Sequence, residues 1–285
     1  MNILQGIPSP EISYIELGPF RIHFYALFIL VGMALAIWIA DRRLQNRGAK
    51  SGLALDISLW TIPFGIIGAR IFHVLTHTDD YFYEGADLTD VFKIWEGGLA
   101  IYGGLMAGAL GAYLGARQSG IKFWSFADAV APGILLAQAI GRWGNYFNEE
   151  LFGQPTTLPW GLDISPLNPA FPDGLPADVL FHPTFLYESI WSLAGVGVLL
   201  LLDRRFELRW GKMFGAYLIY YSIGRIWVEN LRIDPSEILF GLRINVWSGI
   251  LGIVAGIAII YLSSRKHPEP EESPYRADAI ESSSK

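Results

Sequence analysis

The sequence contains no cysteine, so the chain cannot form disulfide bonds or supply a thiolate as a metal ligand or nucleophile. Charged residues are also scarce: they make up 17% of the 285 residues, whereas soluble domains carry about a quarter. Lysines and arginines are dispersed and form no basic face, which gives no indication of nucleic-acid binding. No phosphate-binding loop and no metal-binding set of carboxylates is recognisable, so we expect neither a nucleotide nor a metal ion. No short basic region precedes the first apolar segment, and we therefore expect no cleaved signal peptide.

Hydrophobic residues are abundant instead, at 52% of the sequence, and they gather in seven stretches. Each stretch is close to the ~20 residues that a helix needs to cross a hydrocarbon core of ~30 Å. Because lipid cannot satisfy exposed backbone groups, each stretch should be helical. We predict an all-α, polytopic membrane protein with spans near residues 22–40, 54–75, 97–116, 124–144, 184–202, 213–230 and 245–263.

The orientation of these spans follows from the basic residues in the loops. Lysines and arginines follow the first, third, fifth and seventh spans, whereas residues 77–92 and 145–183 contain none. Short cytoplasmic loops carry an excess of lysine and arginine. We therefore predict that the N-terminus lies outside and that the C-terminus is cytoplasmic.

Domain organisation is predicted to be simple. Residues 1–263 should form one seven-helix transmembrane catalytic domain, with outer-face loops at 76–96 and 145–183. The second of these loops is long and rich in proline, and we expect it to cap the outer face. Residues 264–285 are rich in proline, glutamate and serine, a composition that predicts a disordered cytoplasmic tail.

Ionisable side chains lie near the outer ends of several spans, although each costs on the order of 2.5–3.5 kcal/mol within a membrane. Arg142 lies near the outer end of the fourth span, and Arg70 and Arg225 lie in the outer halves of theirs. Tyr221, Arg225 and Glu229 are spaced i, i+4, i+8, so they share one helical face. Other polar residues at this depth are His23, Tyr25, Tyr102, His182, Tyr187 and Glu188.

A cluster of arginines at the outer face suits a phosphate, because guanidinium groups form paired hydrogen bonds with phosphate oxygens. The depth of these residues therefore predicts a site for an anionic lipid headgroup. Two alternatives remain open. Arg70 and Arg142 could simply extend to the interface, and the tyrosines and His23 could serve as interfacial anchors.

One stretch allows a more specific interpretation. GRWGNYFNEELFG, residues 141–153, closely resembles the signature of bacterial prolipoprotein diacylglyceryl transferases, Gly-Arg-x-Gly-Asn-Phe-x-Asn-x-Glu-x-x-Gly, with Tyr146 in place of the usual Phe. IHFYAL, GGLAIYGGL, HPTFLYE and YSIGRIWVENLR resemble further stretches of the family, in the same order and spacing. The resemblance extends over all seven spans.

The resemblance implies a specific reaction. Members of this family transfer the diacylglyceryl group of phosphatidylglycerol to the lipobox cysteine in the signal peptide of a preprolipoprotein. Glycerol phosphate leaves and a thioether forms, without a metal or other cofactor. The resemblance also implies a multi-pass protein of the bacterial cytoplasmic membrane, whose active site faces the outer leaflet and whose partners are the two substrates and membrane lipids.

Roles for individual residues follow from the same resemblance. Arg142 and Arg225 would hold the phosphate and neutralise the charge that develops on the leaving group. The catalytic candidates are Arg142, Arg225, Tyr102 and Tyr221. The substrate-binding candidates are Arg142, Asn145, Glu150, Glu229, Tyr25, Arg70 and Gly153. For Asn145 a helix-capping role, and for Gly153 a role in a turn or in close packing, are the structural alternatives.

Tyr102 departs from the family pattern. Many members have a histidine at this position, before Gly-Gly-Leu, and a tyrosine with an ordinary pKa of ~10 is a poor base near neutral pH. Tyr102 would then orient the substrate, while a nearby carboxylate, water or the field of the arginines assists loss of the thiol proton. His182 is another candidate base, although His-Pro at a span entrance is equally typical of a helix start.

Two other classes of function are alternatives to the transferase. A transporter or flippase would place polar groups at the bilayer midplane, often within repeats, and this sequence shows neither. A membrane scaffold would use the arginines only to pair carboxylates for packing.

Overall fold

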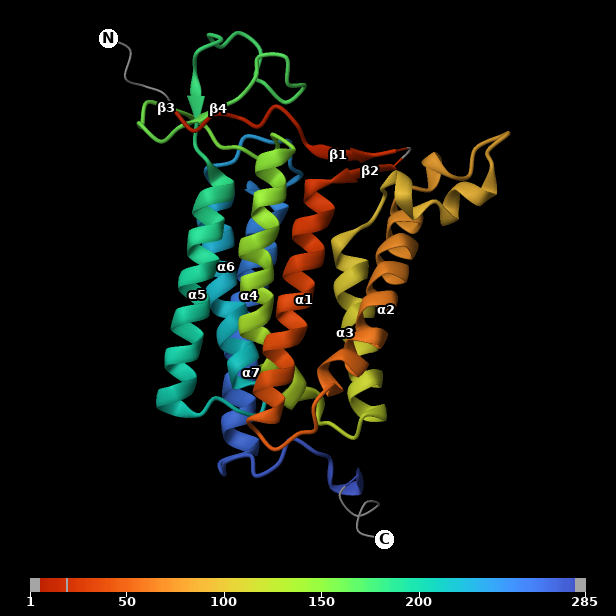
Figure 1. Ribbon diagram of the computed structural model, residues 1–285, viewed down its shortest axis with the longest axis vertical. Coiled ribbons are helices and arrows are strands. Elements are labelled where there is room, and N and C mark those ends of the chain that lie inside the picture. Colours follow the sequence, from red (N-terminus) through yellow and green to blue (C-terminus); the bar gives the residue numbers. More distant parts are fainter. Residues whose placement is uncertain (1–5, 19, 280–285) are drawn as a thin grey trace. The chain divides into compact units, whose positions relative to one another are not determined.

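The computed structural model describes residues 6–18 and 20–279, which belong to two compact units (Figure 1). The first unit comprises Met1–Ile39 and Ala127–Pro270, and the second comprises Ala40–Phe126 and Glu271–Lys285. Seven long helices form in the described residues: α1 (Phe24–Gln45), α2 (Leu53–Thr76), α3 (Ile101–Gln118), α4 (Phe123–Phe147), α5 (Thr184–Phe206), α6 (Lys212–Glu229) and α7 (Ile244–Lys266).

Each predicted span coincides with one of these helices, which confirms the all-α architecture. The largest difference at a helix start concerns α3, which begins at Ile101 rather than at residue 97. Gly97 and Gly98 have φ of 96° and 71°, values in the left-handed region that few other residues adopt. These two glycines keep the chain out of the helix until Ala100.

Five of the helices in the described part of the chain are long and apolar enough to cross a membrane, namely α1, α2, α4, α5 and α7. The other two are less apolar because α3 is rich in glycine and α6 carries Lys212, Arg225 and Glu229. The structure is thus that of a polytopic membrane protein with five clear candidate spans.

The strands are short and belong to the first unit. β1 (Tyr14–Leu17) and β2 (Phe20–His23) pair antiparallel directly before α1. β3 (Pro155–Thr156), β5 (Leu180–Phe181) and β4 (Leu162–Asp163) form a three-stranded antiparallel sheet in the connection between α4 and α5. β6 (Ile238–Leu239) and β7 (Leu242–Arg243) form a hairpin that leads into α7.

Helices α4, α5, α6 and α7 lie side by side in the first unit (Figure 1). Their core includes Leu135, Leu199 and Met213, which are fully buried. Asp128, near the start of α4, is also fully buried, and its carboxylate accepts hydrogen bonds from the backbone N–H groups of Gly211 and Phe214. A carboxylate at a helix N-terminus satisfies otherwise unpaired donors and complements the helix dipole. Asp128 therefore has a structural role, because it joins α4 to the start of α6, far along α4 from Arg142.

The long connection 145–183 has a hydrophobic core of its own. Phe152, Leu162, Ile164 and Phe181 pack together with Phe185 from the first turn of α5. Phe181 lies on the central strand β5, and its ring packs at a tilt against that of Phe152, with 4.8 Å between the ring centres. This core fixes the chain that follows α4 against the start of α5, where the polar residues of the candidate site lie.

In the second unit, α2 and α3 pack closely along their whole length. A Cβ atom on Gly103 would lie 2.3 Å from the carbonyl oxygen of Gly68, and one on Gly111 would lie 2.6 Å from that of Trp60. Small residues let two helix backbones approach in this way. The glycines of α3 thus serve helix packing.

Of the predicted tail, residues 264–279 belong to the described part of the chain, and residues 280–285 lie outside it. Residues 264–266 form the last turn of α7, and residues 271–279 contact the turn before α4 in the second unit. The Glu271 side chain is 2% exposed; it lies 3.5 Å from Lys122 Nζ and accepts a 2.6 Å hydrogen bond from Ser125. Tyr275 pairs with Ile121 and accepts a hydrogen bond from the Lys50 backbone. Specific contacts of a few residues therefore order a segment whose composition predicts disorder.

Candidate active site

The last turn of α4 brings together the polar residues of the GRWGNYFNEELFG stretch. Arg142 Nη1 donates to Asn145 Oδ1 at 3.3 Å, and Asn145 Nδ2 donates to Glu150 Oε1 at 2.7 Å. Asn148 Nδ2 also donates to Glu150, at 3.3 Å. The chain can return toward the helix because Glu149, just after α4, has a positive φ of 49°. The side chain of Asn145 thus links an arginine to a carboxylate across the end of the helix.

Glu188, in the second turn of α5, joins this group to α6. Its Oε2 atom lies 2.6 Å from Arg142 Nη2 and 4.0 Å from Arg225 Nη1. Its side chain is 9% exposed, and those of Arg142 and Arg225 are 19% and 14% exposed. The two arginines expected to bind phosphate therefore lie on either side of one nearly buried carboxylate.

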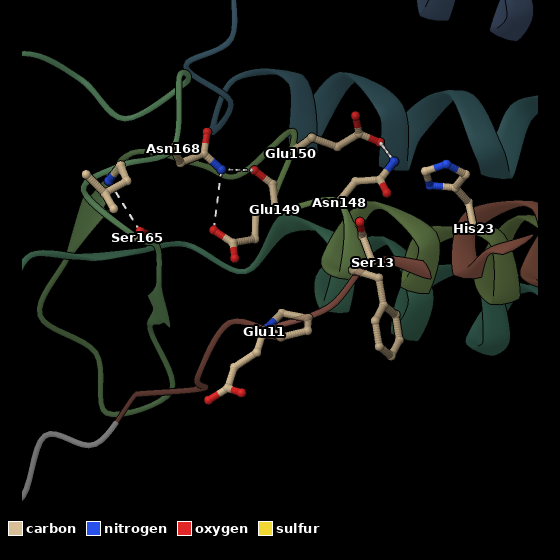
Figure 2. Close-up of a pocket in the computed structure, with 11 residues that line it drawn as sticks. Glu11, Ser13, His23, Asn148, Glu149, Glu150, Ser165 and Asn168 are labelled. Carbon is tan, nitrogen blue, oxygen red and sulfur yellow. Dashed lines mark hydrogen bonds between the residues drawn. The ribbon is translucent and has the colours of Figure 1, made fainter. Parts of the chain in front are cut away.

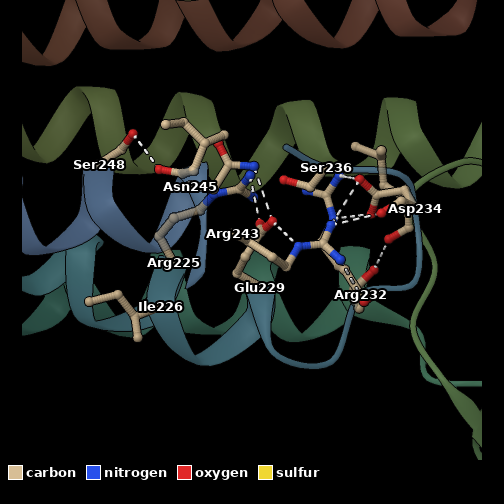
Figure 3. Close-up of polar contacts among 12 residues, drawn as sticks. Arg225, Ile226, Glu229, Arg232, Asp234, Ser236, Arg243, Asn245 and Ser248 are labelled. Atoms are coloured by element: carbon tan, nitrogen blue, oxygen red, sulfur yellow. Dashed lines mark hydrogen bonds and ion pairs between the residues drawn. The ribbon is translucent and has the colours of Figure 1, made fainter. Parts of the chain in front are cut away.

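Glu229, the last residue of α6, continues the chain of contacts (Figure 3). Its side chain is fully buried, and Oε2 lies 3.0 Å from Arg225 Nη2. Oε1 accepts hydrogen bonds from Arg243 Nε at 2.6 Å and Asn245 Nδ2 at 3.1 Å. Arg243 and Asn245 lie at the junction of β7 and α7, so Glu229 connects α6 to α7.

Arg243 also contacts the loop between α6 and β6 (Figure 3). Its guanidinium donates to the backbone carbonyl oxygens of Arg232 and Asp234. Arg232 in turn pairs with both carboxylate oxygens of Asp234, at 2.6 and 2.9 Å. Burial lowers the pKa of Arg232, but its hydrogen bond to Asp234 and the charges of nearby carboxylates outweigh this effect, and the net pKa is raised. Arg232 therefore remains charged.

Arginines and carboxylates alternate through this network. The arginines are Arg142, Arg225, Arg243 and Arg232, and the carboxylates are Glu150, Glu188, Glu229 and Asp234. A charge that is removed from water needs a partner, because an unpaired buried charge is strongly destabilising. An anion that enters between two of the arginines can take the place of a carboxylate. The network can thus exchange an internal anion for an anionic ligand.

Tyr25 and Tyr221 lie on two different helices of the same unit. Tyr25 belongs to the first turn of α1 and packs directly on α4: a Cβ atom on Gly144 would lie 2.4 Å from Tyr25 Cδ2. Tyr221 lies one turn before Arg225 on α6 and stacks on Tyr217 at 6.0 Å. The structure therefore explains why the stretch 141–153 needs a glycine at 144.

Gly153 lies where three segments of backbone meet. It pairs with Arg232 in an isolated β-bridge, and its N–H donates to the carbonyl oxygen of His182 at 2.9 Å. A Cβ atom here would lie 2.8 Å from His182 Cβ and 2.9 Å from the carbonyl oxygen of Leu231. The glycine lets the loop after α4 pass between the segments before α5 and after α6. His182 itself contacts the Tyr187 hydroxyl through Nδ1 at 3.1 Å.

The remaining candidates, Arg70 and Tyr102, belong to the second unit. The Arg70 guanidinium donates to the carbonyl oxygens of Asp90, Val91, Gly97 and Gly98. It also lies 5.0 Å from the centre of the Tyr81 ring. These contacts hold the loop between α2 and α3. Tyr102 lies in the first turn of α3 and is 40% exposed. Their proposed roles in binding and catalysis stay predictions.

A polar cavity of about 580 Å³ adjoins the arginine network at Glu150 (Figure 2). The lining residues come from the N-terminal segment and the loop after α4: Pro10, Glu11, Ser13, His23, Phe147, Asn148, Glu149, Glu150, Ser165, Leu167 and Asn168. Three of them are glutamates and none is lysine or arginine. The walls of this cavity thus carry negative charge, and the arginines of the network do not line it.

Part of this network could not be predicted from the sequence. The sequence places Glu188 at the outer end of its span without a role, and it assigns no role to Arg232, Asp234, Arg243 and Asn245. One signal was available, because Arg232 and Arg243 lie in a loop on the predicted outer side, where residues 77–92 and 145–183 contain no lysine or arginine. Basic residues that depart from the positive-inside pattern need a local reason, and here the reason is a set of buried carboxylates.

The chain is similar to known proteins over most of its length. A family model described as prolipoprotein diacylglyceryl transferase matches residues 13–262. The chain is 51% identical over 277 residues to the phosphatidylglycerol–prolipoprotein diacylglyceryl transferase of Leifsonia xyli subsp. xyli, covering 94% of this chain and 83% of the relative. It is 46% identical to the protein of the same name from Frankia alni, covering 98% and 72%. For the Paenarthrobacter aurescens protein of that name, identity is 45% and coverage is 96% and 88%.

Proposed function

Since this chain belongs to the prolipoprotein diacylglyceryl transferase family, we propose that Arg142 and Arg225 hold the phosphate of phosphatidylglycerol during transfer. The protein is a transferase, and it moves the diacylglyceryl group of phosphatidylglycerol to prolipoproteins. The acceptor atom in this proposal is the thiol sulfur of the lipobox cysteine, so that a thioether forms and glycerol phosphate leaves.

One observation carries the proposal: both arginines lie within 4.0 Å of the same carboxylate oxygen of Glu188. An anionic oxygen is therefore already accommodated between them, and a phosphate oxygen has the same charge preference. Two guanidinium groups in a nearly buried site bind phosphate more strongly than they would in water. They would also stabilise the second negative charge that the phosphate gains as the ester bond breaks.

The other residues of the first unit would support these two arginines. Asn145 fixes Arg142 relative to Glu150, and Glu229 fixes Arg225. Tyr25 and Tyr221 would orient the lipid or the peptide. No role for a cofactor is needed, because the thiolate is the nucleophile and the phosphate ester is the leaving group.

The same proposal places the protein in the bacterial cytoplasmic membrane. It adds α3 and α6 to the five clear spans, so that seven helices cross, with the N-terminus outside and the C-terminus in the cytoplasm. Support comes from the arginines and lysines after α1, α3, α5 and α7. The arginine network then faces the outer leaflet, where both substrates are accessible.

The proposal is tested with purified protein in detergent, phosphatidylglycerol and a synthetic lipobox peptide. Mass spectrometry should detect a diacylglyceryl adduct on the cysteine and stoichiometric release of glycerol phosphate. A peptide in which serine replaces the cysteine is the matched control and should remain unmodified. Adduct formation on both peptides, or on neither, would argue against thiol transfer.

A further inference from the structure

The position of Glu188 raises the question of what happens to its carboxylate when the phosphate binds. Its two ion pairs in the described part of the chain are with Arg142 and Arg225. These are the two residues that the proposed function assigns to the phosphate. If both arginines turn to the phosphate, Glu188 loses these two ion pairs, and the nearby charge of Arg232 remains.

The contrast with Glu229 and Glu150 is clear from their hydrogen bonds. If Arg225 turned to a phosphate, Glu229 would keep Arg243 and Asn245 on its other oxygen. Glu150 is held by Asn145 and Asn148, which are neutral donors. Both of these carboxylates thus keep hydrogen-bond donors when the two arginines turn to the phosphate. Among these three carboxylates, Glu188 is the one whose ion pairs are both with the arginines that turn to the phosphate.

We propose that Glu188 occupies the phosphate position in the free protein and, once the phosphate displaces it, accepts the proton of the lipobox thiol. This inference rests on the proposed function and adds a base to it. When Arg142 and Arg225 turn to the phosphate, the Glu188 oxygen that they contact becomes free to accept a hydrogen bond and then the proton from the thiol. The protein would therefore make its base only when phosphatidylglycerol is in place.

The chemical step balances. The S–H bond of the cysteine breaks and its proton passes to a carboxylate oxygen of Glu188, which leaves a thiolate. The sulfur attacks the glycerol carbon that bears the phosphate ester, so an S–C bond forms and the C–O bond breaks. The electron pair of that bond remains on the phosphate oxygen, and glycerol phosphate leaves with one additional negative charge. Glu188 then releases the proton to water as it pairs with Arg142 again.

This assignment agrees with the contacts of His182, another candidate base in the first unit. His182 has its Nδ1 engaged with Tyr187 and supports the backbone contact of Gly153. A thiol with an ordinary pKa of about 8.5 needs assistance at neutral pH. Glu188 supplies it from within the phosphate site.

The test is the substitution Glu188→Gln, which keeps the shape of the side chain and removes its charge. The Glu188 carboxylate then no longer competes with the phosphate for Arg142 and Arg225. Phosphatidylglycerol should therefore bind the free protein more tightly, and its KM should fall several-fold. The base is also lost, so kcat should fall by about 10²-fold or more. Glu188→Asp should restore part of kcat. Glu16→Gln, in an exposed pair with Arg21, makes the same chemical change away from the site and should leave both parameters unchanged.

A structural role for Glu188 gives a different pattern. If Glu188 only held Arg142 in place, Glu188→Gln would raise KM and weaken binding of phosphatidylglycerol vesicles. An unchanged kcat in Glu188→Gln would likewise overturn the inference. The proposed function is judged separately, by whether the unaltered protein modifies the peptide at all.

Discussion

The guanidinium of Arg243, at the start of α7, lies 2.6 Å from the carboxylate of Glu229, at the end of α6. The Glu229 side chain is fully buried, whereas that of Arg243 is 22% exposed. Together with Asn245, Arg243 therefore holds the last turn of α6 against the start of α7. The position of Arg225, one turn earlier on α6, depends on this contact.

Replacing Arg243 should reduce both stability and transfer. Removing one partner of a buried ion pair costs on the order of 3 kcal/mol, because it leaves the other charge uncompensated. We expect Arg243→Ala to lower the Tm in detergent by several degrees and to reduce kcat/KM. Adding Glu229→Gln should recover part of the lost stability. Arg21→Ala, which breaks an exposed pair, should change stability by less than about 1 kcal/mol. Simple additivity of Arg243→Ala and Glu229→Gln would contradict the coupling.

Arg70 gives a prediction that separates structure from binding. Its guanidinium donates to four backbone carbonyl groups of residues 90–98. We expect Arg70→Ala to speed amide hydrogen exchange in this loop, and Arg70→Lys to do the same, because an ammonium cannot replace a planar fork of donors. A raised KM for phosphatidylglycerol with unchanged exchange would instead show direct substrate binding.

Gly153 should tolerate no side chain. In Gly153→Ala the new Cβ atom would lie 2.8 Å from His182 Cβ and 2.9 Å from a backbone oxygen of Leu231, so the loop must move. We expect loss of most transfer activity and a lower Tm. The control is Gly197→Ala in α5, where a Cβ atom meets nothing within 4 Å and alanine favours the helix by about 1 kcal/mol. Equal effects of the two substitutions would refute the packing argument.

The end of the chain offers a test of the contacts around Glu271. Truncation after Pro270 removes the buried ion pair with Lys122 and the pairing of Tyr275 with Ile121. It should make the turn between α3 and α4 more sensitive to proteolysis. Truncation after Ala279 leaves these contacts in place and serves as the control. If both truncated proteins are cleaved at the same rate as the full chain, residues 271–279 do not stabilise this turn.

Much of the fold could be predicted from the sequence, because a long apolar segment that crosses a membrane must be helical. The start of each helix was found to within a few residues, except where Gly97 and Gly98 delay α3. The order of residues 271–279 could not be predicted, because composition favours disorder and the contacts of one buried glutamate oppose it. Composition describes the average of a whole segment, whereas the contacts that order this one depend on a single residue, Glu271.

The candidate site was predicted only in part, for a similar reason. Arg142, Asn145 and Glu150 lie within nine residues of one another, so the motif already joins them. Glu188 comes from α5 and Arg243 from β7, and their roles follow from distances to Arg142 and Glu229 on α4 and α6. No spacing along the chain reveals that Glu188 lies between two arginines.

The most direct test of the account compares peptide modification by the unaltered protein with that by Arg142→Ala and Arg225→Ala, measured by mass spectrometry at saturating phosphatidylglycerol. Each substitution should reduce the rate by about 10²–10³-fold, as for other groups that stabilise developing charge. Arg204→Ala, at the exposed end of α5, is the matched control and should retain full activity. Transfer at the normal rate by either Arg142→Ala or Arg225→Ala would contradict the claim that these two arginines hold the phosphate.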